Sequence, residues 1–140
     1  MDHVVYLDLK ANELENILSG KKTMIIRGAA GRKMPYGRVN IGDILYLLEN
    51  DGTREIKAKV EVNFVFNSEK MDSDDSTALV DEYQDRLLLT SAQIKRWAGK
   101  RYLILIGVFN PEKIKSFTID MSDYGNMDDW LPVREIQPLK

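Results

Sequence analysis

Two stretches decide the expected fold: residues 14–28 read LENILSGKKTMIIRG, and residues 39–49 read VNIGDILYLLE. The first stretch has apolar residues at the spacing of one helix face, followed by a glycine that can end the helix. A short apolar strand, residues 23–26, then ends before Arg27. In the second stretch a Gly-Asp pair makes a turn before the apolar strand 44–48. The pattern therefore predicts helix, strand, loop and strand in close succession.

The rest of the chain mixes strand and helix patterns. The expected strands are residues 4–9, 23–26, 44–48, 56–66, 102–109 and 114–119. The expected helices are residues 12–19 with Asn12 as cap, residues 91–98 with a capping box from Thr90 and Gln93, and the weakly helical residues 73–87. The turns are Asn50-Asp51-Gly52 and Asn110-Pro111, residues 29–40 form a loop, and the tail is irregular from about residue 120.

This order of elements predicts an α+β fold in one domain, residues 1–140. We expect a small mixed β-barrel of five or six strands with two or three flanking helices. A parallel doubly wound sheet is excluded because the strand–helix alternation is not sustained.

The composition excludes several kinds of site. The chain has 140 residues, of which 44% are hydrophobic and 30% charged, as in an ordinary folded domain. It has no cysteine, which excludes disulfides, thiolate metal sites and cysteine nucleophiles. His3 is the single histidine, so we expect no metal and no other cofactor, and we place it at the surface or a strand edge. Without a membrane-spanning run or a signal-peptide pattern, we expect a cytoplasmic protein with no membrane partner.

The charges are unevenly distributed although the net charge is only −2. Residues 20–40 contain six basic residues and no acid, whereas residues 68–85 contain seven acids and one lysine. Either run can be a solvated face. The basic run also contains glycines, whose backbone amides can approach an anion closely. A local basic binding surface therefore remains possible in a chain that is not globally basic.

The quoted stretches resemble the ASCH domain of the PUA-like superfamily. That family shows an apolar helix, a Gly-Lys-Lys-Thr turn, a short strand ending in arginine, and a Gly-Asp pair before the next strand. Here these features are residues 20–23, Arg27 and residues 42–43, within about the first half of the chain. The resemblance implies a barrel with a cleft beside its helices. It also implies that RNA or a nucleotide-like ligand is the partner; the oligomeric state stays open.

The candidate binding residues combine cations that suit phosphate with aromatic rings that suit bases. Lys22 and Arg27 flank one short strand, and we expect them to converge on one anion-binding point with the loop 29–40 as its lid. The alternative for Arg27 is an internal ion pair with Asp43. The aromatic candidates can equally serve packing. The candidate ligand-binding residues are Lys21, Lys22, Thr23, Arg27, Arg32, Lys33, Tyr36, Arg38 and Trp130.

The resemblance also raises an alternative function, a small hydrolase acting on a nucleoside or nucleotide. Some ASCH relatives deacetylate N4-acetylcytidine with a lysine, a threonine and a distant glutamate. The lysine falls on Lys22, but the threonine falls on Ile25, which has no hydroxyl. Thr23 is out of phase on the strand, and Glu69 and Glu82 are the candidate carboxylates. We therefore expect a binding module without catalytic residues.

Overall fold

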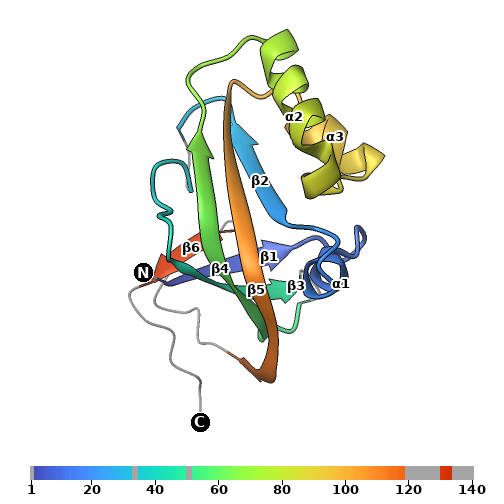
Figure 1. The fold of residues 1–140 in the computed structure, drawn as a ribbon, viewed down its shortest axis with the longest axis vertical. Helices are drawn as coiled ribbons and strands as arrows, with labels where there is room; N and C mark the ends of the chain where they lie inside the picture. Colours follow the sequence, from blue (N-terminus) through green and yellow to red (C-terminus); the bar gives the residue numbers. More distant parts are fainter. Residues whose placement is uncertain (1, 33–34, 50–51, 119–129, 134–140) are drawn as a thin grey trace.

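The computed structural model describes residues 2–32, 35–49, 52–118 and 130–133, which form one mixed sheet and three helices (Figure 1). The elements in chain order are β1 (Asp2–Leu7), α1 (Glu13–Leu18), β2 (Met24–Ala29), β3 (Ile44–Glu49), β4 (Glu55–Asn67), α2 (Ser73–Leu87), α3 (Ser91–Trp97), β5 (Tyr102–Thr118) and β6 (Trp130–Val133). The six strands lie in the order β2-β5-β4-β3-β1-β6. Only β1 and β3 pair in parallel among these neighbours.

The sheet curls into a partly open barrel whose two edges are β2 and β6. Figure 1 shows β4 and β5 running the length of the molecule, with α2 and α3 beside one half and α1 beside the other. The expected α+β class and the small mixed barrel with flanking helices are thus confirmed. The strands β3 and β4 pair as the predicted hairpin. Asn50 and Asp51 of its turn lie outside the described residues.

One predicted turn is wrong, because β5 is continuous where the sequence predicts separate strands 102–109 and 114–119. Asn110 has a left-handed backbone with φ of 50°. The pairing of β5 with β4 shifts by one residue across this point, which makes a β-bulge. A bulge accommodates Pro111, which has no N–H to donate to the ladder. The chain therefore bends at Asn110-Pro111 and continues in the same strand.

Two further expectations need correction, one about the cap of α1 and one about the C-terminal tail. Asn12 precedes α1 in a left-handed conformation, and its side chain makes no capping hydrogen bond. The tail is not irregular throughout, because β6 pairs antiparallel with β1, with Trp130 opposite Val5. Both outcomes depend on partners that are distant in sequence or on turn geometry. In contrast, the predicted capping box of Thr90 and Gln93 at α3 is confirmed.

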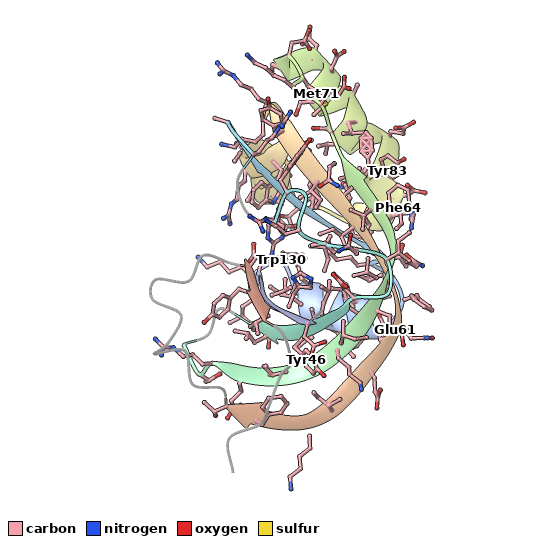
Figure 2. All side chains as sticks on the ribbon, turned by 90° about the vertical axis from the view of Figure 1, so that its left-hand side faces the viewer. Tyr46, Glu61, Phe64, Met71, Tyr83 and Trp130 are labelled. Carbon is pink, nitrogen blue, oxygen red and sulfur yellow. The ribbon has the colours of Figure 1, made fainter. Side chains whose placement is uncertain are left out.

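The apolar side chains form two main cores on opposite faces of β2. Ile25 belongs to the core inside the curled sheet. Met24 and Ile26 belong to the core between the sheet, α2 and α3. Figure 2 shows Phe64 and Tyr83 in the helix-covered half, and their ring centroids are 6.2 Å apart. The side chains of β2 therefore alternate between these two cores, and the strand divides the molecule into two packed halves.

The strands approach one another closely at Gly107, where β5 lies between β2 and β4. A Cβ placed there would lie 2.7 Å from Asn63 Oδ1 and 2.7 Å from Phe64 Cβ. The substitution Gly107→Ala should therefore lower the free energy of unfolding by about 1–3 kcal/mol, measured by urea denaturation. Gly31→Ala is the control, since a Cβ at Gly31 has nothing within 4 Å. Equal stability of the two variants would contradict the close packing at Gly107.

Candidate functional site

Arg27 lies in β2, two residues before its end, and connects it to a strand that β2 does not pair with. Its guanidinium donates from Nη1 to the carbonyl of Ile26 and from Nη2 to the carbonyl of Tyr6, both at 2.7 Å. Tyr6 belongs to β1, which neighbours the opposite edge strand β6. The side chain is only 6% exposed. Arg27 therefore bridges the open side of the barrel through bonds to backbone carbonyls. Asp43, which the sequence offered as an alternative partner for Arg27, is bonded to His3.

Two tryptophans contact the same guanidinium. The Arg27 Cζ atom lies 5.8 Å from the ring centroid of Trp97 in α3 and 5.7 Å from that of Trp130 in β6. Arg96 lies against Trp97 as well, at 4.5 Å. Cation–π contacts of this kind contribute up to about 2 kcal/mol each when they are shielded from water. The arrangement thus connects a helix, an edge strand and β2 through one charged side chain.

The indole of Trp130 continues this network towards the start of the chain. Its Nε1 donates to His3 Nδ1 at 3.1 Å, and His3 Nε2 contacts Asp43 Oδ2 at 2.8 Å. Because Nδ1 accepts from the indole, the proton of a neutral His3 must lie on Nε2, facing the carboxylate. His3 is fully buried, so its expected position at the surface is wrong. Sequence offers no local signal for this role, because its partners are 40 and 127 residues away.

Asp43 accepts hydrogen bonds from two directions. Besides His3, the backbone N–H of Asn40 donates to Asp43 Oδ2 at 2.9 Å. Burial raises the pKa of Asp43, but the hydrogen bonds from His3 and Asn40 outweigh this effect and hold the pKa below its ordinary value. Asp43 therefore remains ionised and fixes the Gly-Asp turn before β3, as the sequence predicts for the backbone bond.

Lys22 lies in the turn before β2 and is buried, with 1% of its surface exposed. Its Nζ donates to the carbonyl of Leu87 and lies 3.4 Å from Glu13 Oε2. The other oxygen of Glu13 accepts the backbone N–H of Asp8 at 2.8 Å. Burial lowers the pKa of Lys22; the Glu13 carboxylate opposes this shift, and the charge of Arg27 adds to it. Lys22 and Arg27 thus influence each other electrostatically, while each side chain has its own protein partners.

The loop after β2 places an exposed cation over two tyrosines. The Cζ atom of Arg32 lies 5.8 Å from the ring centroid of Tyr36 and 5.6 Å from that of Tyr102. Those two rings meet edge to face at 5.7 Å. The Tyr36 hydroxyl donates to the carbonyl of Ser68, which fixes the loop against the end of β4. We call Arg32, Tyr36 and Tyr102 the mouth. The sequence analysis missed Tyr102, because only the pairing of β2 with β5 brings it here.

The cavity beneath the mouth is small. It is lined by Arg27, Tyr36, Tyr102 and neighbouring loop residues, and its volume is about 10 Å³. A space of this size holds at most about one water molecule. A base therefore has no room beneath the mouth in this conformation, and any nucleotide has to lie across the outside of it.

The remaining candidate residues are spread over the surface. Lys21 is exposed before β2, whereas Arg38 is exposed in the loop beyond the other end of that strand. A six-residue strand separates its ends by about 20 Å, so these two cations do not share one point. Thr23 is half-buried and accepts from Arg86 Nε at 3.4 Å. Lys33 lies outside the described residues.

The carboxylate beside Lys22 also differs from the sequence candidates. Glu69 and Glu82 are exposed on the surface, whereas Glu13 is the acid that contacts Lys22. The short helix is the signal that could have identified Glu13. After α1 the glycine turn reverses the chain, which then runs back towards the first residue of the helix. Residue 22 then lies beside residue 13.

None of the helices in the described part of the chain has both the length and the apolar character needed to cross a membrane. Among the described residues, no group of three or more His, Cys, Asp or Glu side chains could hold a metal ion.

Comparison with known proteins establishes the fold. No family model and no curated protein matches the chain. The crystal structure of ASCH from Zymomonas mobilis superposes with a TM-score of 0.65 and 13% identity, covering 99% of this chain and 87% of that chain. A single-substitution variant of that protein gives a TM-score of 0.69 and 13% identity, covering 96% and 89%. Another variant gives 0.65 and 15%, covering 99% and 90%. The chain therefore has the fold of an ASCH domain.

The depressed pKa of Asp43 makes a prediction about stability and pH. Its contribution is complete above the ordinary pKa of 3.8 and is lost as the pH falls below that value towards the folded-state pKa. Asp43→Asn should lower the free energy of unfolding at neutral pH by about 1–3 kcal/mol. The variant should also lose less stability than the parent as the solution is acidified through that range, measured by urea denaturation.

The control for this comparison is Asp81→Asn, on the exposed surface of α2. Its free energy of unfolding should change with pH in the same way as that of the parent. If Asp43→Asn shows the same acid dependence as the parent, the buried His3–Asp43 hydrogen bond contributes no measurable stability.

Proposed function

We propose that this chain is an RNA- or nucleotide-binding module whose ligand lies across the mouth, on the basic surface beside the barrel. The observation that carries the proposal is the exposed Arg32 guanidinium over the rings of Tyr36 and Tyr102. Arginine presents a fork of donors to phosphate, and aromatic rings give bases a surface for stacking. The ASCH fold is consistent with this reading.

Neighbouring cations support the same surface. Arg96, Lys100 and Arg101 are exposed around the connection from α3 to β5, and the Cβ atom of Lys100 lies near Gly28. Glu69 is an exposed acid next to Ser68, to which Tyr36 is bonded, and it offsets one of these charges. The balance favours a polyanion over a neutral ligand, because positive charge beside a low-dielectric wall attracts phosphate.

In this proposal Lys22 and Arg27 do not contact the ligand directly. Both are buried and bonded to protein atoms, so their charges reach the surface as electrostatic potential. Arg27 also lines the small cavity under the mouth, which makes it the support for Tyr36 and Tyr102. Arg32 and Arg38 then contact the phosphates of the ligand, and the ring of Tyr36 stacks on a base.

Binding of single-stranded RNA should therefore weaken steeply with salt. We expect Arg32→Gln to weaken binding of a fluorescent uridine decamer and to reduce the slope of log affinity against log salt by about 0.7, the value for one phosphate contact. Fluorescence anisotropy at several salt concentrations measures both quantities. Lys59→Gln is the control, since Lys59 lies on β4 and pairs with Glu112 at 3.7 Å. Affinity that is independent of salt would contradict phosphate recognition at the mouth.

The alternative, a hydrolase acting on nucleosides, has one supporting observation. Lys22 is a buried amine with a lowered pKa beside a carboxylate, which is a property of some catalytic bases. Ile25 points into the barrel core, so the hydroxyl used by the acetylcytidine-cleaving relatives has no counterpart at that position.

We accordingly expect no release of acetate from N4-acetylcytidine by the purified chain, assayed by chromatography of the products. Lys22→Met is the informative variant, because it keeps the stem of the side chain and removes the amine. Turnover by the parent that disappears in a folded Lys22→Met protein would establish the hydrolase instead.

A further inference from the structure

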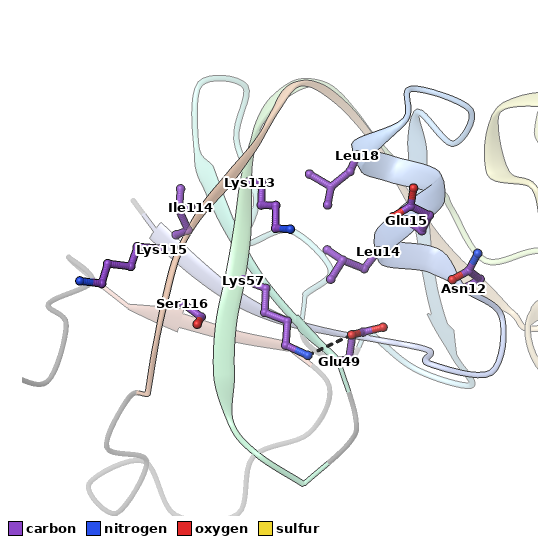
Figure 3. A pocket seen from close by; sticks show the side chains of 10 residues that line it. All are labelled: Asn12, Leu14, Glu15, Leu18, Glu49, Lys57, Lys113, Ile114, Lys115 and Ser116. Carbon is purple, nitrogen blue, oxygen red and sulfur yellow. Dashed lines mark hydrogen bonds and ion pairs between the residues drawn. The ribbon is translucent and has the colours of Figure 1, made fainter.

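A second pocket, of about 590 Å³, lies away from the mouth, between α1 and the strands β3, β4 and β5. Figure 3 shows α1 on one side of it and the strands on the other. None of the residues assigned to the mouth lines this pocket. Its volume is in the range of small-molecule sites, which is about 300–1,000 Å³. The small cavity under the mouth, at about 10 Å³, is far below that range.

The wall formed by α1 presents two leucines to the pocket. Leu14 and Leu18 are one helical turn apart and both line the pocket. Leu14 is buried and belongs to the main core, which keeps its position fixed, whereas Leu18 is half-buried and packs against that core. Ile114 of β5 adds a third aliphatic side chain. A ligand at this wall would remove apolar surface from water.

The wall formed by the strands carries positive charge. Three lysines and two glutamates line the pocket, which leaves one net positive charge. Lys57 and Glu49 neutralise each other, with Nζ and Oε1 3.1 Å apart. The ammonium group of Lys113 has no hydrogen bond or ion pair with any residue that the structure describes. In Figure 3 its side chain extends towards Leu14 and Leu18, while that of Lys115 extends away from them.

We propose that this pocket binds a small molecule with one anionic group on an apolar body. The anion, a carboxylate or a phosphate, lies at the ammonium group of Lys113. The apolar body lies on Leu14 and Leu18. Glu15, on the same helix, also lines the pocket and limits it to ligands of low charge, because a second anionic group would meet its carboxylate. This site is independent of the RNA-binding proposal, since it shares no residue with the mouth.

The test uses octanoate and octyl phosphate as probes for the two head groups, with the full chain labelled by nitrogen-15. Binding should shift the backbone amide signals of Leu18, Ile114 and Ser116. Butanoate, which has the same charge and a shorter body, should bind at least tenfold more weakly because each buried methylene contributes to affinity. Octanamide, which has the body without the charge, should also bind at least fivefold more weakly than octanoate.

Lys113→Gln removes the proposed partner of the anion and should weaken the binding of octanoate at least fivefold. Lys59→Gln is the matched control on a neighbouring strand, outside the pocket, and should bind like the parent. Preference for one of the two head groups identifies the anion. The proposal is overturned if neither probe shifts these signals, if Lys113→Gln binds as well as Lys59→Gln, or if the shifts occur at the mouth. Because Lys113 is exposed, the folded state of its variant is checked readily by the unchanged remainder of the spectrum.

Discussion

The guanidinium of Arg27 joins parts of the molecule that the strand ladder leaves separate. The sheet ends at β2 on one side and at β6 on the other, and Arg27 crosses this gap by donating to the carbonyl of Tyr6. Trp97 and Trp130 lie against the same group, one from α3 and one from β6. A planar, permanently charged fork can make these contacts at once, whereas an ammonium group cannot. The open side of the barrel therefore has a polar bridge in place of a further pair of strands.

The buried charges near this bridge are matched one by one. Asp43 is held by His3 and by a backbone amide, and Lys22 is held by Glu13 and a carbonyl. Removing one member of such a pair leaves the other without compensation in a region of low dielectric, so each pair restricts which chain segments can meet. The short strand β6 is held in two ways: it pairs with β1, and its Trp130 donates a hydrogen bond to His3.

The two proposed binding surfaces follow from the long bent strands β4 and β5. These strands carry one end of the sheet under α2 and α3 and curl the other end towards α1 (Figure 1). The mouth is where β5 begins beside the loop after β2, and the lysine-lined pocket is where β5 passes α1 near its end. The bulge at Asn110 lies between them and is one of three register shifts in the pairing of β4 with β5.

The class of fold, most element positions and the capping box at Thr90 could be predicted from the sequence alone. These features depend on periodicity and on neighbours within a few residues. The bend of a continuous strand at Asn110-Pro111 can be recognised only in the folded chain, because a bulge needs a partner strand to be distinguished from a turn. The same holds for the contact of Lys22 with Glu13 and for the burial of His3 between Trp130 and Asp43. Such pairings depend on which distant segments share a low-dielectric interior, and a single sequence carries no periodic signal for that.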